Sequence, residues 1–231
     1  MAEGLRRDAV RLIFANRNYS SWSLRAWLVP KHFGIPFQEE LVLLSGEGWR
    51  ENIRRLSPSG RVPVLIDGDL VIPETLAIIE YLAESFPEKA IWPRSKADRA
   101  LARSVASEMH GGFAALREAA PMNLRATHPG KVDIDVVADD LRRIEALWSD
   151  LLDRSGGPYL FGEFSAADAM YAPVATRIRT YELPASDAAQ EYVEAVYALP
   201  AFQEWYVEAV REPWIVEDDE IDIMRARAAA R

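Results

Sequence analysis

Three observations predict a small α/β domain followed by an all-helical domain. Over residues 1–88, short β-type apolar runs alternate with runs of helical periodicity. From residue 98 onward the periodicity is helical only. Between them, the stretch 89–97, KAIWPRSKA, breaks both patterns and is typical of a linker. We therefore expect an α/β domain at 1–88, a linker at 89–97 and a helical domain with an acidic tail at 98–231.

The α/β domain is expected to run strand, helix, strand, an irregular piece, then strand, strand and helix. These elements are expected at 9–15, 24–33, 37–44, 62–66, 70–72 and 74–86. Asp67-Gly68-Asp69 separates the third and fourth strands and is a strong hairpin signal. The first helix contains Pro30, and a proline costs about 3 kcal/mol in a helix interior unless the helix kinks or starts late.

The helical domain is expected from apolar residues that recur at steps of three and four over 105–116 and over 137–151. Two further helices are expected to begin near Ser165 and, as the last one, near Pro200. Ser165 and Asp168 have the spacing of a capping box, with Asp in place of the usual Glu. We interpret this box as structural and expect its loss to cost about 1 kcal/mol. The acidic run at 217–220 is expected to be solvated.

Composition limits the classes of function. Of the 231 residues, 49% are hydrophobic and 27% are charged, which is ordinary for a soluble globular protein. The net charge of -9 disfavours nucleic acid and anionic membrane surfaces as partners. No apolar run reaches 18 residues, so no transmembrane helix is expected. Residues 1–8, MAEGLRRD, lack the order of a signal peptide, and we expect a cytoplasmic location.

The chain has no cysteine, which excludes disulfides, thiolate metal sites and a protein thiol nucleophile. A thiol reductase is therefore disfavoured, because it needs a cysteine for the mixed disulfide. His32, His110 and His128 are too far apart for a His-x-x-x-His pattern, and we expect no metal. A serine hydrolase lacks support, because there is no Gly-x-Ser-x-Gly motif.

Three hydroxyls surround the start of the first helix, from Ser20, Ser21 and Ser23. Serine is a favourable helix cap, which is one interpretation of the motif. The other is a hydroxyl donor directed at an anion, supported by the positive end of the helix dipole. From these residues alone both interpretations stay open.

Two further motifs lie at the ends of expected elements. Pro63 stands at the start of a strand, where it removes a ladder donor. If the Val62–Pro63 bond is cis, the Val62 backbone faces outward and can pair with a peptide-like ligand. Glu74 and Thr75 open the next helix. Thr75 with the free helix N–H groups can hold a carboxylate, and Glu74 an ammonium, or Glu74 is only a favourable first-turn acid.

The order and spacing of these motifs resemble the glutathione S-transferase family, from about residue 10 to 215. The resemblance implies an N-terminal thioredoxin-like domain, with Val62–Pro63 at the family's cis-proline and Glu74-Thr75 at its Glu-Ser pair. The loop 20–25, SSWSLR, looks most like the zeta class, which reads Ser-Ser-Cys-Ser-x-Arg. Trp22 replaces that Cys, which weakens any zeta-specific inference, including maleylacetoacetate isomerisation.

The resemblance implies that a serine hydroxyl activates the thiol of glutathione, the co-substrate. Theta-like and delta-like spacing favours Ser21 as the donor, and zeta-like spacing favours Ser20. Arg25 is expected to order the loop. The residues that the resemblance implies for glutathione binding are Ser23, Arg61, Val62, Pro63, Glu74 and Thr75. Those expected to line a pocket for a small hydrophobic electrophile are Met109, His110, Phe113 and Met122.

Within that binding set, the Val62 backbone is expected to pair with the cysteinyl part of glutathione. Glu74 and Thr75 are expected to hold the γ-glutamyl end, and Arg61 the glycyl carboxylate. The family further implies a homodimer and a role in detoxification.

Two alternatives to a serine-type transferase remain. One is a glutathione-binding or protein-interaction module on the same fold without significant catalysis. The other is a glutathione-dependent isomerase. The joint presence of the serines, Val62-Pro63 and Glu74-Thr75 favours an enzyme, because a pure interaction module does not need them together.

Overall fold

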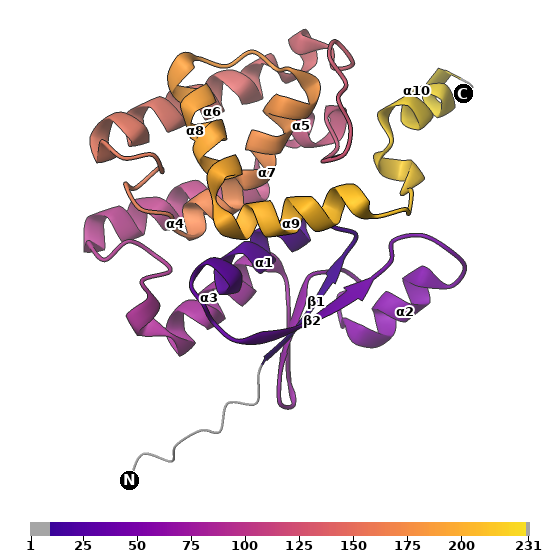
Figure 1. Cartoon of the computed structure of the whole chain (residues 1–231), viewed down its shortest axis with the longest axis horizontal. Helices are drawn as coiled ribbons and strands as arrows, with labels where there is room; N and C mark the ends of the chain where they lie inside the picture. The colour runs from indigo at the N-terminus through magenta and orange to yellow at the C-terminus, as the bar shows by residue number, and fades with distance from the viewer. Residues whose placement is uncertain (1–9, 230–231) are drawn as a thin grey trace.

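The computed structural model describes residues 10–229 (Figure 1). Ala9 and the segment 1–8, which entered the predictions of the first strand and of location, lie outside the described residues. The N-terminal part holds β1 (Val10–Ala15), α1 (Ser21–His32), β2 (Phe37–Val42), α2 (Trp49–Leu56), β3 (Val64–Asp67), β4 (Leu70–Pro73) and α3 (Thr75–Ser85).

The rest of the described chain is helical. It holds η1 (Pro87–Lys89), α4 (Lys96–Gly111), α5 (Ala114–Ala119), α6 (Ile134–Ser155), α7 (Ala166–Tyr181), α8 (Asp187–Ala198), α9 (Pro200–Arg211), η2 (Glu217–Asp219) and α10 (Ile221–Ala229). The predicted fold class, α/β followed by all-α, is confirmed. None of these helices is long and apolar enough to cross a membrane.

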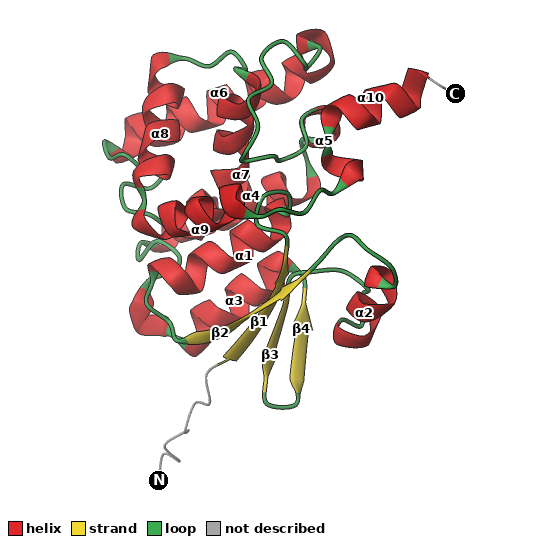
Figure 2. Cartoon of the chain, turned by 45° about the vertical axis from the view of Figure 1, so that its right-hand side comes forward, coloured by secondary structure: helices red, strands yellow, loops and turns green. Residues whose placement is uncertain are grey.

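The sheet has the strand order β2-β1-β3-β4. β1 runs parallel to β2 and antiparallel to β3, and β3 and β4 form the hairpin that the Asp-Gly-Asp signal predicted. β1 is buried on both faces, which explains its continuous apolar sequence. Leu12 and Phe14 pack into the main core with α1 and α3, whereas Ile13 packs with Ile53 of α2 on the other face. Figure 2 shows α2 apart from α1 and α3, across the sheet.

α2 occupies a stretch for which the sequence predicted no regular structure. Trp49, Ile53 and Leu56 follow one another at steps of four and three, and all three belong to the small core under the sheet. Five of the eight residues are polar or charged, which hides this short apolar face. α8 was also missed, although Ser186 caps it through the N–H of Ala189.

α1 begins three residues earlier than predicted, because Ser20 is its N-cap. Pro30 lies in the last turn of the helix, so it removes one hydrogen bond, to the C=O of Ala26, and leaves the preceding turns intact. There the N–H of Ile35 donates to the C=O of Pro30 at 2.9 Å and closes the turn. This position resolves the conflict between Pro30 and a helical assignment.

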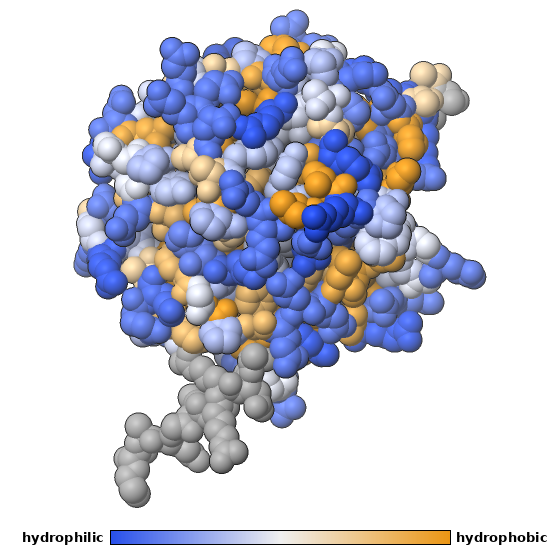
Figure 3. Space-filling model, viewed as in Figure 1, coloured by the Kyte–Doolittle hydropathy of each residue, from blue (hydrophilic) through white to orange (hydrophobic). Residues whose placement is uncertain are grey.

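α7 is the central helix of the molecule. Every residue of it except Arg179 is buried, and it packs against α1, α4 and α8. Its many alanines let these neighbours approach closely. On the face shown in Figure 3, by contrast, hydrophilic residues cover most of the surface and apolar residues gather only in small groups.

The capping box at the start of α7 is present and more deeply buried than its sequence signature requires. The Asp168 carboxylate accepts from the backbone N–H of Leu160 (2.9 Å) and of Ser165 (2.8 Å), and from the hydroxyls of Ser165 (3.0 Å) and Tyr192 (3.1 Å). Asp168 is fully buried, and burial raises its pKa to about 6 although these donors oppose the shift. The predicted cost of about 1 kcal/mol is therefore too small for Asp168.

Replacement of Asp168 by alanine is expected to lower the free energy of unfolding by about 3 kcal/mol or more, because it leaves four donors without an acceptor. Urea unfolding followed by circular dichroism measures the loss. Asp135→Ala removes an exposed acid from the first turn of α6 and serves as the control, with a change within about 0.5 kcal/mol. Equal small losses in both variants would contradict the role assigned to Asp168.

Candidate active site

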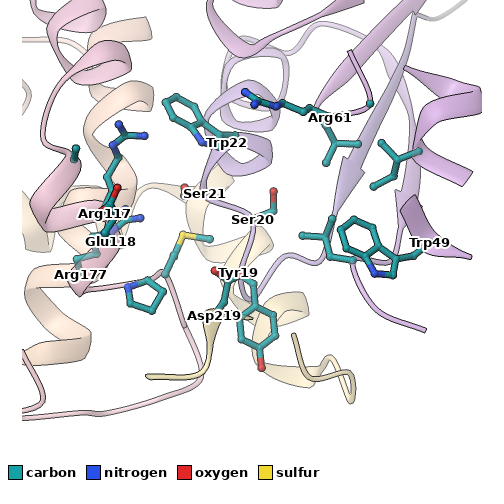
Figure 4. Close-up of a pocket in the computed structure, with 17 residues that line it drawn as sticks. Tyr19, Ser20, Ser21, Trp22, Trp49, Arg61, Arg117, Glu118, Arg177 and Asp219 are labelled. Carbon is teal, nitrogen blue, oxygen red and sulfur yellow. The ribbon is translucent and has the colours of Figure 1, made fainter. Parts of the chain in front are cut away.

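Two cavities adjoin at the boundary between the α/β part and the helical part. The first, the Ser20 pocket, has a volume of about 520 Å³. The second, the Glu74 pocket, has a volume of about 490 Å³. Both are lined by Trp22, Arg61, Val62 and Arg117, so the four residues mark the junction of the cavities. Figure 4 shows the Ser20 pocket, with Arg61 on one side and Arg117, Glu118 and Arg177 on the other.

Ser20 and Ser21 both line the Ser20 pocket, but their hydroxyls differ. Ser20 Oγ accepts the N–H of Ser23 (3.4 Å) and donates to Ser23 Oγ (2.8 Å). The Ser21 hydroxyl makes no hydrogen bond within residues 10–229, and neither do the backbone N–H groups of Ser21 and Trp22. A free hydroxyl and free N–H groups at a helix N-terminus form a site that stabilises an anion.

Ser23 does not lie in either cavity, contrary to the predicted ligand contact. It is fully buried, and its Oγ accepts the N–H of Ala15 at 3.0 Å as well as the Ser20 hydroxyl. Ser23 therefore joins the end of β1 to the start of α1, and this bond fixes the direction in which Ser20 and Ser21 are presented.

Val62, Pro63 and Arg61 lie on the α/β side of the junction. The Val62–Pro63 peptide bond is cis. In the part of the chain that the structure describes, the backbone N–H and C=O of Val62 have no partner, and the Arg61 side chain makes no ion pair. Both a main-chain pairing site and an unpaired cation are thus available beside the serines.

Glu74 has an unusual backbone conformation, with φ 87° and ψ 136°. Residues other than glycine rarely adopt it, and it costs of order 1–3 kcal/mol. The carboxylate accepts the N–H groups of Leu76 and Ala77 at 3.0–3.1 Å and contacts Nε2 of His110 at 2.8 Å. Next to it, the Thr75 hydroxyl donates to the C=O of Trp22 at 3.2 Å. Glu74 thus caps α3 and links it to α4.

The structure brings only two of the four residues predicted for the electrophile pocket into the cavities. Met122 lines the Ser20 pocket and His110 the Glu74 pocket. Met109 and Phe113 lie in neither cavity; both are buried in the main core, where the Phe113 ring meets Tyr171 at 6.3 Å. The helical phase of α4 turns Met109 inward, whereas Phe113 lies beyond the end of α4, where it is the N-cap of α5 with φ 54°. The periodicity of the sequence shows neither this break nor which face meets the neighbouring domain.

Besides Arg61, three arginines gather around the Ser20 pocket. Arg117 and Arg177 line it, and Arg25 lies fully buried beneath Trp22. Arg177 Nε donates to the C=O of Ala120 at 2.7 Å, and burial lowers its pKa to about 10. Burial, together with Arg177 and Arg117, also lowers the pKa of Arg25. The guanidinium groups rest on backbone carbonyls instead of carboxylates, which favours binding of an anion.

Family models match both parts of the chain. Residues 19–85 match the model of the glutathione S-transferase N-terminal domain, and residues 99–207 match that of the glutathione S-transferase C-terminal domain. The chain belongs to the glutathione S-transferase family. The resemblance drawn from the motifs is thereby confirmed, together with the thioredoxin-like fold of the N-terminal part.

Named relatives include both transferases and isomerases. The probable maleylacetoacetate isomerase of Vibrio cholerae serotype O1 is 30% identical over 187 residues, which cover 73% of this chain and 82% of that protein. Glutathione S-transferase 1 of Dianthus caryophyllus is 32% identical over 156 residues, which cover 66% and 70%. The crystal structure of a glutathione transferase homolog from Burkholderia, with bound glutathione, has a TM-score of 0.70 at 23% identity and covers 87% of this chain and 98% of that one.

In this glutathione S-transferase family member, the C-terminal segment after α9 returns to the serine loop. Glu212 accepts the backbone N–H of Arg17 (2.7 Å) and of Asn18 (3.2 Å), and the Tyr19 hydroxyl donates to Glu220 at 2.5 Å. Asp219 lines the Ser20 pocket. The expectation of a solvated acidic run at 217–220 holds for Glu217 and Asp218, which are exposed, but is wrong for the other two: Asp219 is partly buried in the pocket wall, and Glu220 binds Tyr19, 201 residues away in sequence.

Sequence reasoning missed several residues of the site. Six of the residues that line the Ser20 pocket without having been proposed are Tyr19, Trp22, Trp49, Arg117, Arg177 and Asp219. Tyr19 directly precedes Ser20, and Trp22 directly follows Ser21. Their position next to these serines was the available signal that they line the same pocket. The others come from four separate elements, and no local pattern connects them. Within residues 10–229, no cluster of three or more acidic or histidine side chains has the arrangement of a metal site.

Proposed function

We propose that this protein is a glutathione transferase in which a serine hydroxyl at the start of α1 activates the glutathione thiol. The observation that carries the proposal is the free Ser21 hydroxyl, next to free helix N–H groups, in a cavity that adjoins the Glu74 pocket. Membership of the family supports glutathione as the co-substrate. Ser21 is the preferred donor, because the Ser20 proton is already donated to Ser23.

The chemistry needs a change in the protonation of the thiol. A free thiol of this kind has a pKa of about 8.5, so only about 3% is thiolate at pH 7. A hydroxyl donor and a helix N-terminus stabilise the thiolate, and a fall of about two units corresponds to about 2.7 kcal/mol. The thiolate then attacks an electrophilic carbon, and the serine remains a hydrogen-bond donor throughout.

The proposed position of glutathione follows the junction of the two cavities. Its cysteinyl backbone pairs with the unpartnered N–H and C=O of Val62. Its glycyl carboxylate meets Arg61, and its γ-glutamyl end enters the Glu74 pocket beside Thr75. The ammonium there shares the Glu74 carboxylate with the α3 N-terminus and with His110.

A second candidate is a glutathione-dependent isomerase that acts on a carboxylate-bearing substrate. Arg117 and Arg177 in the Ser20 pocket favour an anionic second substrate over a purely hydrophobic one. The name of the Vibrio cholerae relative supports the same reaction class. Trp22, in place of the zeta-class Cys, is the feature that separates this chain from that class.

Other properties implied by the family belong to the same proposal. They are a homodimer, a cytoplasmic location and a role in detoxification. Leu70 and Val71 of the β3–β4 hairpin are exposed apolar residues, which supports an interface there. Light scattering distinguishes such a dimer from a monomer of 26.0 kDa.

Titration calorimetry with reduced glutathione tests the proposal. We expect a dissociation constant between micromolar and millimolar (about -8 to -4 kcal/mol), and tighter binding of S-hexylglutathione because the Ser20 pocket accepts the alkyl chain. Glu74→Ala is expected to weaken glutathione binding, whereas Glu84→Ala, which removes an exposed acid from the same helix, is not. Absence of binding by both compounds would favour a non-catalytic module on this fold.

Replacing Ser20 and Ser21 one at a time distinguishes activation of the glutathione thiol from capping of α1. Ser21→Ala is expected to raise the thiol pKa of bound glutathione, followed by ultraviolet absorbance of the thiolate, and to lower kcat at least about tenfold, one pKa unit or more. Stability is expected to stay unchanged. Ser20→Ala is expected to cost about 1 kcal/mol of stability by loss of the cap. Full activity in both variants would rule out activation by serine.

Asp219 is expected to make the binding of anionic ligands depend on pH. Burial raises its pKa to about 6; Arg177 opposes this shift, and Asp218 and Glu220 add to it. Below pH 6 Asp219 is neutral, and above pH 6 it repels a ligand carboxylate. The affinity of S-(carboxymethyl)glutathione relative to S-methylglutathione should therefore fall about fivefold between pH 5 and pH 7 (~1 kcal/mol). Asp219→Asn should remove this fall; a ratio with the same pH dependence in that variant would exclude Asp219.

A further inference from the structure

Trp22 occupies the junction of the two cavities. It is half-buried, lines both the Ser20 pocket and the Glu74 pocket, and follows directly on the two serines. Its C=O accepts the Thr75 hydroxyl, so its backbone is fixed to the start of α3. The indole therefore stands as a wall between the γ-glutamyl end of the proposed glutathione site and the side where the electrophile enters.

Three charged or aromatic groups hold the indole ring. The guanidinium carbon of Arg25 lies 4.4 Å from the ring centre, and that of Arg117 lies 5.5 Å from it. The His110 ring approaches edge-on with its centre at 5.3 Å. These groups come from α1, α5 and α4, so the orientation of the wall is set by both domains.

Arg25 is the most informative of these contacts. It is fully buried, its Nε donates to the C=O of Met170 at 2.7 Å, and its two terminal nitrogens have no hydrogen-bond partner among residues 10–229. The cation–π contact with Trp22 is thus a principal stabilising interaction of the buried Arg25 guanidinium, and rotation of the indole would break it. We therefore expect the Trp22 indole to keep one orientation when a ligand binds.

We propose that Trp22 is the residue that selects the electrophile, by offering a flat indole surface against which a planar, electron-poor ring or conjugated acceptor stacks. The inference rests on the proposed function and deepens it. An electron-rich indole favours stacking with an electron-poor ring. Arg117, which shares the wall, meets a nitro or carboxylate substituent at the edge of that ring.

Two electrophiles of different shape test the proposal. With 1-chloro-2,4-dinitrobenzene, the thiolate sulfur bonds to the ring carbon, the C–Cl bond breaks and chloride leaves with the bonding electrons, while the thiol proton goes to solvent. With iodoacetamide, the same thiolate displaces iodide from a small sp³ carbon that has no ring to stack. The quantity of interest is the ratio of kcat/KM for the two electrophiles, after subtraction of the uncatalysed rates.

Trp22→Leu is expected to lower this ratio about five- to tenfold, mainly through the KM of the dinitrobenzene. Trp22→Phe keeps a flat aromatic face, and its kcat/KM ratio is expected to stay within about threefold of that of the unmodified protein. Glutathione affinity, measured by calorimetry, is expected to change less than about twofold in both variants. Trp214→Leu, at an exposed tryptophan outside both cavities, is the matched control and is expected to leave the ratio unchanged.

Two results for Trp22→Leu would overturn this proposal and leave the proposed function standing, and both leave the ratio unchanged. One is an equal fall in kcat/KM for both electrophiles, which would make Trp22 part of thiol activation or of the local structure. The other is no change in kcat/KM for either electrophile, which would remove Trp22 from the site. If the unmodified protein neither binds glutathione nor accelerates either reaction, the proposed function fails, and the assignment of Trp22 fails with it.

Discussion

The burial of α1 is the constraint on which the rest of the structure depends. Eight consecutive residues, Ser23 to Pro30, are buried, because the sheet covers one side of the helix and α7 the other. A helix enclosed in this way has its N-terminus at the domain boundary, and the two serines open it there. The bond from Ala15 to Ser23 then fixes the turn from β1 into the helix. Catalytic geometry and domain packing thus depend on the same element.

The electrostatics of the site are opposite to those of the whole chain. The net charge is -9, yet four arginines lie in or beside the Ser20 pocket, and two of them, Arg25 and Arg177, are buried. A buried cation without a carboxylate is costly, and it is retained where backbone carbonyls and aromatic faces replace part of its hydration. Met170 and Ala120 supply the carbonyls, and Trp22 supplies the aromatic face. A thiolate or carboxylate that binds in the pocket therefore supplies negative charge that the carbonyls and the indole do not.

The fold and the serine motif were predictable because they depend on interactions between residues that are close in sequence. The apolar run of β1, the Asp-Gly-Asp hairpin and the Ser165–Asp168 spacing each lie within a few residues. The missing helix α2 shows the limit, since its apolar face consists of three residues among charged neighbours. Met109 shows a second limit, because periodicity gives a helical face but not the partner that this face meets, and Phe113 shows a third, because the helix that the periodicity predicted through 105–116 is interrupted there.

The parts of the site that escaped prediction are those made by contacts between distant segments. Asp219 reaches the Ser20 pocket because Glu220 binds Tyr19 and Glu212 binds the backbone before it. The composition of an acidic run does not predict such partners, because a solvated run and a run that packs against another segment can have the same composition. Only the surroundings distinguish them, since the backbone N–H groups of Arg17 and Asn18 need an acceptor when the loop is covered, and Glu212 supplies it.

Glu74 combines an unfavourable backbone conformation with a contact between the two domains. Its backbone conformation is unfavourable for any residue with a side chain, so a glycine would relieve the strain. A glycine would also remove the carboxylate that caps α3 and that contacts His110 across the domain boundary. The cap and this bridge offset the strain in part, and the remaining cost is consistent with a carboxylate held ready for a cationic ligand group. A residue kept only to cap α3 would have been served as well by an Asp, Ser or Thr with an ordinary extended backbone.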